Sequence, residues 1–152
     1  MKRHRVSDQE GRESLVGHAA ERAGEARSVY GGREPGLAAE QLAELLEDRR
    51  FVRYPVRIDF DGSSLEPGEF AFPEAVEDGN PSAGFVIHVH PEFQSKPAAV
   101  PLLVAYHLVR VNYGEIAGPE AAEMFGATLC GMEVDDYYAA LCRHADLLSE
   151  GV

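Results

Sequence analysis

Two neighbouring stretches of the chain decide its fold, GFVIHVHPEF at positions 84–93 and AAVPLLVAYHLVRVNY at positions 98–113. The first divides into two strand faces, one with Phe85, Ile87 and Val89 and the other with Val86, His88 and His90. The second is apolar nearly all round, which is typical of a helix inside a domain. Together they predict a strand whose more apolar face is covered by the following helix.

Outward from these stretches, the patterns predict a single α+β domain over 37–152. Leucines at helical spacing indicate a helix at 37–49, and alternation indicates strands at 51–60 and near 69–72. Pro73 confines the second of these strands to an edge or an end. Two more helices follow at 119–130 and 134–148, the last with a core stripe of Val134, Tyr138, Leu141 and Leu148. The order is an N-terminal helix, a small three- to four-stranded mixed or antiparallel sheet, and three C-terminal helices.

Residues 1–36 read differently, as a flexible polar N-terminal arm. Small and charged residues dominate this segment, and its few sizeable apolar groups offset little of the entropy lost on ordering it. Alanine, glutamate and arginine favour at most a short helix at 13–27. We therefore expect the arm to contribute little to folding.

Composition narrows the classes of function. The net charge of -12 disfavours nucleic acid and anionic membranes as partners. The longest apolar run, 100–109, is too short to span a bilayer, and no secretory signal opens the sequence. Cys130 and Cys142 form no CxxC motif, and we expect them to be reduced, buried thiols in a cytoplasmic protein.

The helix at 98–113 carries the first candidate site. Tyr106, His107 and Arg110 stand close together among its apolar residues. A buried arginine needs a carboxylate partner, and Glu120 and Glu123 on the next helix are the nearest candidates in the sequence. The group indicates either a structural Arg–Glu bridge or a polar pocket that recognises an anionic or carbonyl group.

A second candidate is a zinc site made by three histidines. His88 and His90 share one strand face, and His107 lies on the helix that follows. Three such ligands with one open position are typical of catalytic zinc. The alternative is two histidines on a half-exposed strand and one packed helix histidine. Because the more apolar strand face should claim the core, we expect no bound zinc and no cofactor.

The segment 54–132 resembles the core of small bacterial zincin-type metallopeptidases. The strand that ends in His90-Pro91, the apolar helix and the Glu-x-x-Ala-like second helix carry this resemblance. It implies that 106–110 takes the place of the HExxH motif, with Tyr106, His107 and Arg110 in place of the first ligand, the base and the second ligand. It further implies that Glu120 or Glu123 matches the acidic ligand. Family peptidase activity cannot be carried over, because the motif residues differ.

The leading hypothesis from sequence is therefore a non-catalytic, zincin-like binding or interaction domain, whose partner is a protein or a small anionic ligand. The alternative is a metal-dependent hydrolase that uses His88, His90 and His107 with a carboxylate such as Glu120 or Glu92. A third hypothesis is a homodimer in which the apolar helix completes the interface.

Overall fold

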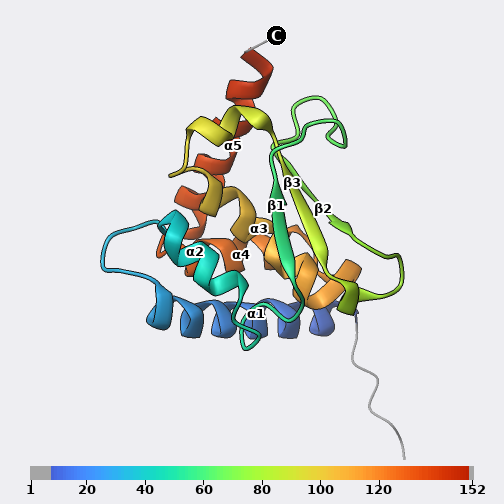
Figure 1. Ribbon diagram of the computed structural model, residues 1–152. Coiled ribbons are helices and arrows are strands. Elements are labelled where there is room, and N and C mark those ends of the chain that lie inside the picture. The colour runs from blue at the N-terminus through green and yellow to red at the C-terminus, as the bar shows by residue number, and fades with distance from the viewer. Residues whose placement is uncertain (1–7, 151–152) are drawn as a thin grey trace, which may run out of the picture.

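The computed structural model describes residues 8–150 as five helices and a three-stranded mixed sheet (Figure 1). The helices are α1 (Asp8–Tyr30), α2 (Ala39–Leu46), α3 (Val100–Tyr113), α4 (Pro119–Leu129) and α5 (Val134–Glu150). The strands are β1 (Val56–Asp59), β2 (Ala71–Ala75) and β3 (Phe85–Val89), and 3-10 turns occupy Pro81–Ala83, Pro91–Ser95 and Gly114–Ile116. The α+β class and the predicted order from α2 to α5 are confirmed.

The central strand of the sheet is β3, which runs parallel to β1 and antiparallel to β2. Pro73 lies opposite Ile87 on the edge strand β2, as predicted. Proline has no N–H to donate, and on an edge strand this interrupts hydrogen bonding to no second neighbouring strand. β1 is shorter than the predicted 51–60, because the amides of Phe51 and Val52 turn back to donate to the Asp48 carbonyl. Ile87 and Val89 of β3 join the hydrophobic core, and Val86 and His88, which point to the other face of the strand, are buried as well.

Helix α3 fills the space between the sheet and the other helices. It contacts β2 and β3 on one side and α4 on the other. Its Leu103, Val104 and Leu108 are fully buried, as are Ile87 and Val89 of β3. Burial on nearly every side is what the continuous apolar pattern of 98–113 predicts.

The N-terminal segment is not the flexible arm that the sequence suggests, over the part that is described. Residues 8–30 form the long helix α1, which packs across α4 with Ala19, Ala23 and Ala26 completely buried. Gly24 faces Thr128 on α4, so small residues let the two helices approach closely. A helix face made of alanines packs closely although it has no large apolar side chains. The sequence of such a helix therefore shows no strong hydrophobic periodicity. Residues 1–7 of the predicted arm lie outside the described residues.

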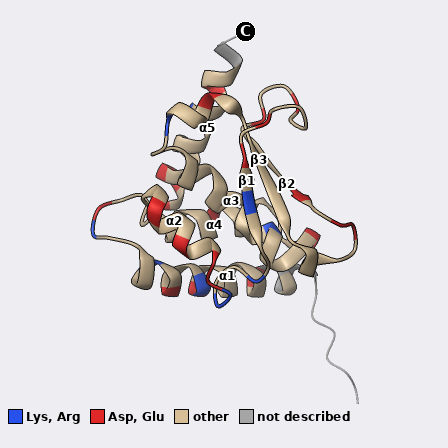
Figure 2. Cartoon of the chain, viewed as in Figure 1, with Lys and Arg blue, Asp and Glu red and all other residues tan. Residues whose placement is uncertain are grey.

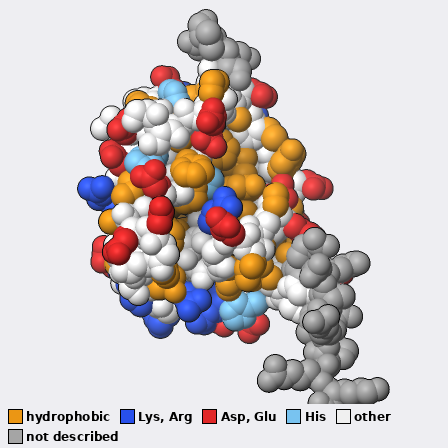
Figure 3. Space-filling view, turned by 90° about the vertical axis from the view of Figure 1, so that its right-hand side faces the viewer, with side chains coloured by type: hydrophobic (Ala, Val, Ile, Leu, Met, Phe, Trp, Pro, Cys, Tyr) orange, Lys and Arg blue, Asp and Glu red, His pale blue; other side chains and the backbone are white. Residues whose placement is uncertain are grey.

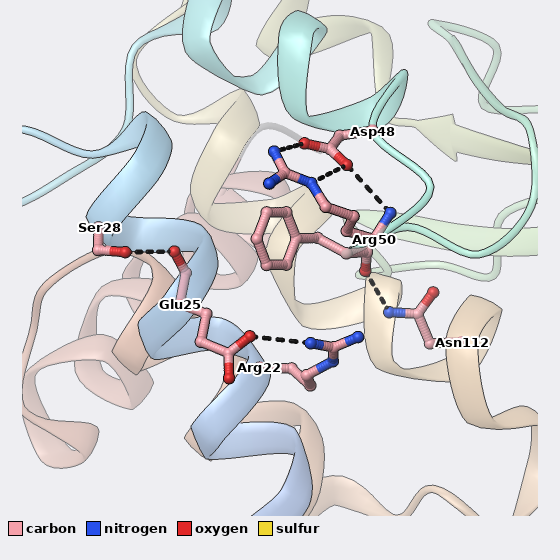
Figure 4. A network of polar contacts seen from close by, with 7 residues as sticks. Arg22, Glu25, Ser28, Asp48, Arg50 and Asn112 are labelled. Carbon is pink, nitrogen blue, oxygen red and sulfur yellow. Dashed lines mark hydrogen bonds and ion pairs between the residues drawn. The ribbon is translucent and has the colours of Figure 1, made fainter.

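Polar and aromatic contacts fix α1 to the segment after α2, and Figure 4 shows Arg22 of α1 together with Asp48 and Arg50 of that segment. The Tyr30 hydroxyl donates to Asp48 at 2.6 Å, and Arg50 donates to the same carboxylate at 2.7 Å. These contacts hold the pKa of Asp48 well below its usual range, with the Arg50 hydrogen bond the largest cause. The Phe51 ring lies under the guanidinium groups of Arg22 and Arg50, at 5.9 and 5.1 Å from its centroid. These contacts join the N-terminal helix to the rest of the fold.

Asn112 and Arg27 extend this junction. The buried Asn112 amide donates to the Phe51 carbonyl at 2.7 Å and accepts from the Arg53 amide at 2.9 Å. Arg27 donates from one guanidinium to four backbone carbonyls, those of Gly32, Glu34, Gly36 and Leu129. The loop between α1 and α2 is thus held in one shape against the end of α4.

The surface reflects the acidic composition. Acidic side chains are spread over helices and loops, and basic ones are fewer (Figure 2). Within residues 8–150, no helix is both long enough and apolar enough to cross a membrane.

Candidate functional site

A pocket of about 290 Å³ lies between α3, α5 and the segment that leads into β2. Its lining is mostly aromatic and apolar and consists of Gly68, Glu69, Phe70, Ala71, Tyr106, His107, Tyr138, Leu141, Cys142 and Ala145. Figure 3, which views the side of the molecule with β2, shows hydrophobic side chains gathered at the centre of that face with acidic ones around them. Two of the residues predicted for a pocket, Tyr106 and His107, belong to this lining.

His107 is the most perturbed polar group of the pocket. Its Nε2 atom is buried and has no hydrogen-bond partner among the described residues. Its ring packs edge-on against Phe70 and Tyr106, with centroids 6.0 and 5.2 Å apart. Burial, followed by the charge of Arg110, lowers the pKa of His107 to about 4. The imidazole is therefore uncharged at neutral pH.

The pKa of His107 gives a testable dependence of stability on pH. A histidine with a folded pKa of about 4 and an ordinary value of 6.5 binds fewer protons in the folded state than in the unfolded state. The free energy of unfolding should therefore be unaffected by this group above pH 6.5. It should fall by at most about 3 kcal/mol as the pH is lowered from 6.5 towards 4. His107→Phe keeps an aromatic ring and should show a smaller loss in denaturant titrations between about pH 7 and about pH 4. An identical pH dependence in the two proteins would show that His107 is not held neutral.

Two tyrosines and a cysteine complete the pocket. Tyr138 is 54% exposed at its rim, and its pKa is raised first by a hydrogen bond with Cys142 and then by the charges of Cys142 and Glu123. The pKa of Tyr106 is raised mainly by burial and then by the charge of Glu123. Tyr138 and Cys142 were not predicted for this site, although their spacing of four residues places them on one helical face. The sequence alone could have indicated that Tyr138 and Cys142 share a helical face, but not which segment of the protein lies opposite that face.

The predicted buried bridge from Arg110 to Glu120 or Glu123 is wrong. Arg110 is exposed, and it forms no ion pair with any acidic side chain that the structure describes. Glu120 is exposed at the start of α4, and Glu123 is half-buried. The reason lies in the packing of α3, which turns Leu108, Val109 and Val111 into the protein and leaves Arg110 on the outer side. Arg110, Glu120 and Glu123 therefore do not line the pocket.

The three histidines of the alternative zinc site lie apart. His88 pairs across the sheet with Asp59 and Phe72, on the face opposite to Ile87 and Val89, which join the core. Its Nε2 atom lies 3.4 Å from Glu74 Oε1. His90 ends the strand, and its Nδ1 atom accepts from the Glu92 amide at 3.1 Å as a cap of the following turn.

His107 therefore lies on the opposite side of the sheet from His88. Throughout the described part of the chain, no three His, Cys, Asp or Glu side chains form a group that could hold a metal ion. The ligand set His88, His90 and His107 is thus not assembled in this fold. The alternation of β3 predicts this separation, because consecutive side chains of a strand point to opposite faces.

Comparisons with known proteins assign no family. No protein-family model, curated protein or solved structure matches the chain. The resemblance to zincin-type metallopeptidases consequently stays a prediction. The chemistry of the pocket is the basis on which a function can be proposed.

Proposed function

We propose that this protein is a non-catalytic binding domain whose pocket between α3 and α5 holds a small, uncharged, mostly apolar molecule. The observation that carries the proposal is an aromatic pocket of about 290 Å³ beside a neutral histidine with an unpartnered, buried nitrogen. Small-molecule sites are typically concave and apolar, with a few polar groups that fix orientation. A pocket of this size fits a single ring with a short substituent.

The electrostatics of the pocket favour a neutral ligand over an anion. His107 is uncharged at neutral pH. Negative charge is close by, because Glu69 lines the pocket and the charge of Glu123 raises the pKa of Tyr106 and Tyr138. Arg110, the cation expected to attract an anion, does not belong to the lining. A ligand hydroxyl or N–H could exchange a hydrogen bond with the imidazole, which offers one donor and one acceptor nitrogen. A small anionic ligand is therefore disfavoured in this pocket.

The same groups support a role without catalysis. General acid–base catalysis needs a pKa near the working pH. The pKa of His107 is lowered to about 4, and those of Tyr106 and Tyr138 are raised. The hydrolase alternative rests on His88, His90 and His107, which the fold keeps apart. We place the protein in the cytoplasm on the basis of its two free cysteines, and a zincin-like scaffold remains part of the proposal.

Benzyl alcohol and benzoate, which match in size and differ in charge, test this proposal. Titration followed by amide chemical shifts should show benzyl alcohol perturbing the segment 68–71 and the facing turns of α3 and α5. Benzoate should bind at least about tenfold more weakly, since like charges in a partly dry site cost more than 1 kcal/mol. Ala145→Phe fills the pocket and should abolish the response.

Ala139→Phe is the matched control, because Ala139 is exposed on the same helix and does not line this pocket. This variant should bind benzyl alcohol as the parent does. Equal binding of benzoate, shifts that map elsewhere, or unchanged binding by Ala145→Phe would each contradict the proposal.

A further inference from the structure

A second hollow, of about 640 Å³, lies on another side of the fold, between the loop that joins α1 to α2 and helix α5. Its lining is partly apolar and partly basic and includes Arg33, Glu34, Leu102, Met132, Ala140, Arg143 and His144. Figure 2 shows the loop between α1 and α2 at the left-hand edge of the molecule, with a basic and an acidic segment next to each other on it. We call this hollow the α2–α5 groove.

The loop that carries Arg33 forms one wall of the groove, and hydrogen bonds from Arg27 fix its backbone. The Arg27 guanidinium donates to the carbonyls of Gly32, Glu34 and Gly36 at 2.6 to 2.8 Å. The Gly36 amide also donates to the Cys130 carbonyl at 2.6 Å. Arg33 therefore projects from a loop whose backbone is fixed, which lowers the entropy lost when it engages a ligand.

The groove is locally positive in an acidic protein. Arg33 and Arg143 both line it, and neither has an ion pair or hydrogen bond with a residue whose side chain the structure describes. Glu34 is the acidic residue among the lining, so the two guanidinium groups outweigh it. The start of α2 also faces the groove, and its N-cap residue Ala38 has no side chain to accept from the first-turn amides.

His144 is the third polar group of the groove. Its Nδ1 atom is buried without a hydrogen-bond partner in the described part of the chain. Its ring packs edge-on against Phe93, with centroids 5.6 Å apart. The pKa of His144 is lowered first by burial and then by the charges of Arg143 and Lys96. The positive charges of Arg143 and Lys96 thus both favour the neutral form of this imidazole, although Lys96 is paired with Glu92 at 3.7 Å.

We infer that the α2–α5 groove binds a small organic anion. Its carboxylate or phosphate group would lie between Arg33 and Arg143, since a guanidinium group can hold such oxygens with two parallel hydrogen bonds. The apolar part of the ligand would rest against Leu102, Met132 and Ala140. This site is separate from the proposed pocket for neutral molecules and goes beyond it. The anionic ligand predicted from sequence would then belong here, with a different set of arginines.

Phenyl phosphate, inorganic phosphate and benzyl alcohol are the probes that test this inference on the full chain. Phenyl phosphate should shift the amides of residues 32–41 and of Leu102, Met132 and Ala140, and inorganic phosphate should shift the basic end alone and more weakly. Benzyl alcohol should leave the groove unperturbed. Binding of phenyl phosphate should weaken with added salt, because exposed charges are screened.

The variants Arg33→Gln and Arg143→Gln should each weaken phenyl phosphate binding about tenfold, the effect of losing one charge-assisted hydrogen bond. Both side chains are exposed and without partners in the described residues, so the thermal unfolding of these variants should match the parent. Arg110→Gln is the control, since Arg110 is also exposed and lies outside the groove, and phenyl phosphate binding by this variant should be unchanged. Shifts outside the groove, equal weakening by Arg110→Gln, or parent-like binding by both variants would overturn the inference.

Discussion

A chain that lacks residues 1–30 is expected to lose cooperative thermal unfolding. Helix α1 covers α4 with fully buried alanines, and Tyr30 and Arg27 hold the segments around Asp48 and the α1–α2 loop. A domain is typically stable by only about 5–15 kcal/mol, and removing a whole packed helix exposes the apolar surface of α4. Circular dichroism melting should show a broad, shallow transition. A sharp transition within a few degrees of the parent would mean that α1 is dispensable.

Point variants in α1 test the same packing without truncation. Ala23→Glu buries a charge against α4 and should cost about 3–5 kcal/mol. Gly17→Ala is its control on the exposed side of the same helix, where an added Cβ meets nothing. It should stabilise the protein by up to about 1 kcal/mol through helix propensity. If both variants unfold at the parent's denaturant midpoint, α1 is not packed as described.

The second large effect is expected at Gly126, whose replacement by alanine should cost about 2–4 kcal/mol. A Cβ at this position would collide with the ring and hydroxyl of Tyr137. Tyr137 is fully buried and anchored, because its hydroxyl donates to the Leu102 carbonyl at 2.7 Å. The ring cannot move away without losing that hydrogen bond. Urea unfolding of the variant and the parent measures the difference.

Gly118→Ala and a second background serve as controls for the Gly126 variant. A Cβ at Gly118 has open space around it, so this variant should stay within about 1 kcal/mol of the parent. In a Tyr137→Leu background, whose shorter side chain does not reach position 126, Gly126→Ala should cost much less. An equal cost in both backgrounds would show that the Tyr137 ring is not the cause.

Several features of this protein were determined by its sequence alone. The continuous apolar helix at 98–113 after an alternating strand predicted α3 lying on β3, and Pro73 predicted an edge strand. These signals are local, because periodicity and the missing proline N–H act within one element. The same alternation predicted that His88 lies on the face of β3 opposite to Ile87 and Val89. Tyr106 and His107, which were predicted for a polar pocket, line a mostly apolar one.

Other features were decided only by tertiary packing. The sequence assigned Tyr138 to the core stripe of the last helix, yet Tyr137 is the buried residue, because Gly126 on α4 leaves room for its ring. Helix α1 packs through alanines that carry almost no pattern. Arg110 faces outward because its neighbours in α3 face the protein interior. In each case the outcome depends on the shape of a second element distant in sequence, which a periodicity within one segment does not contain.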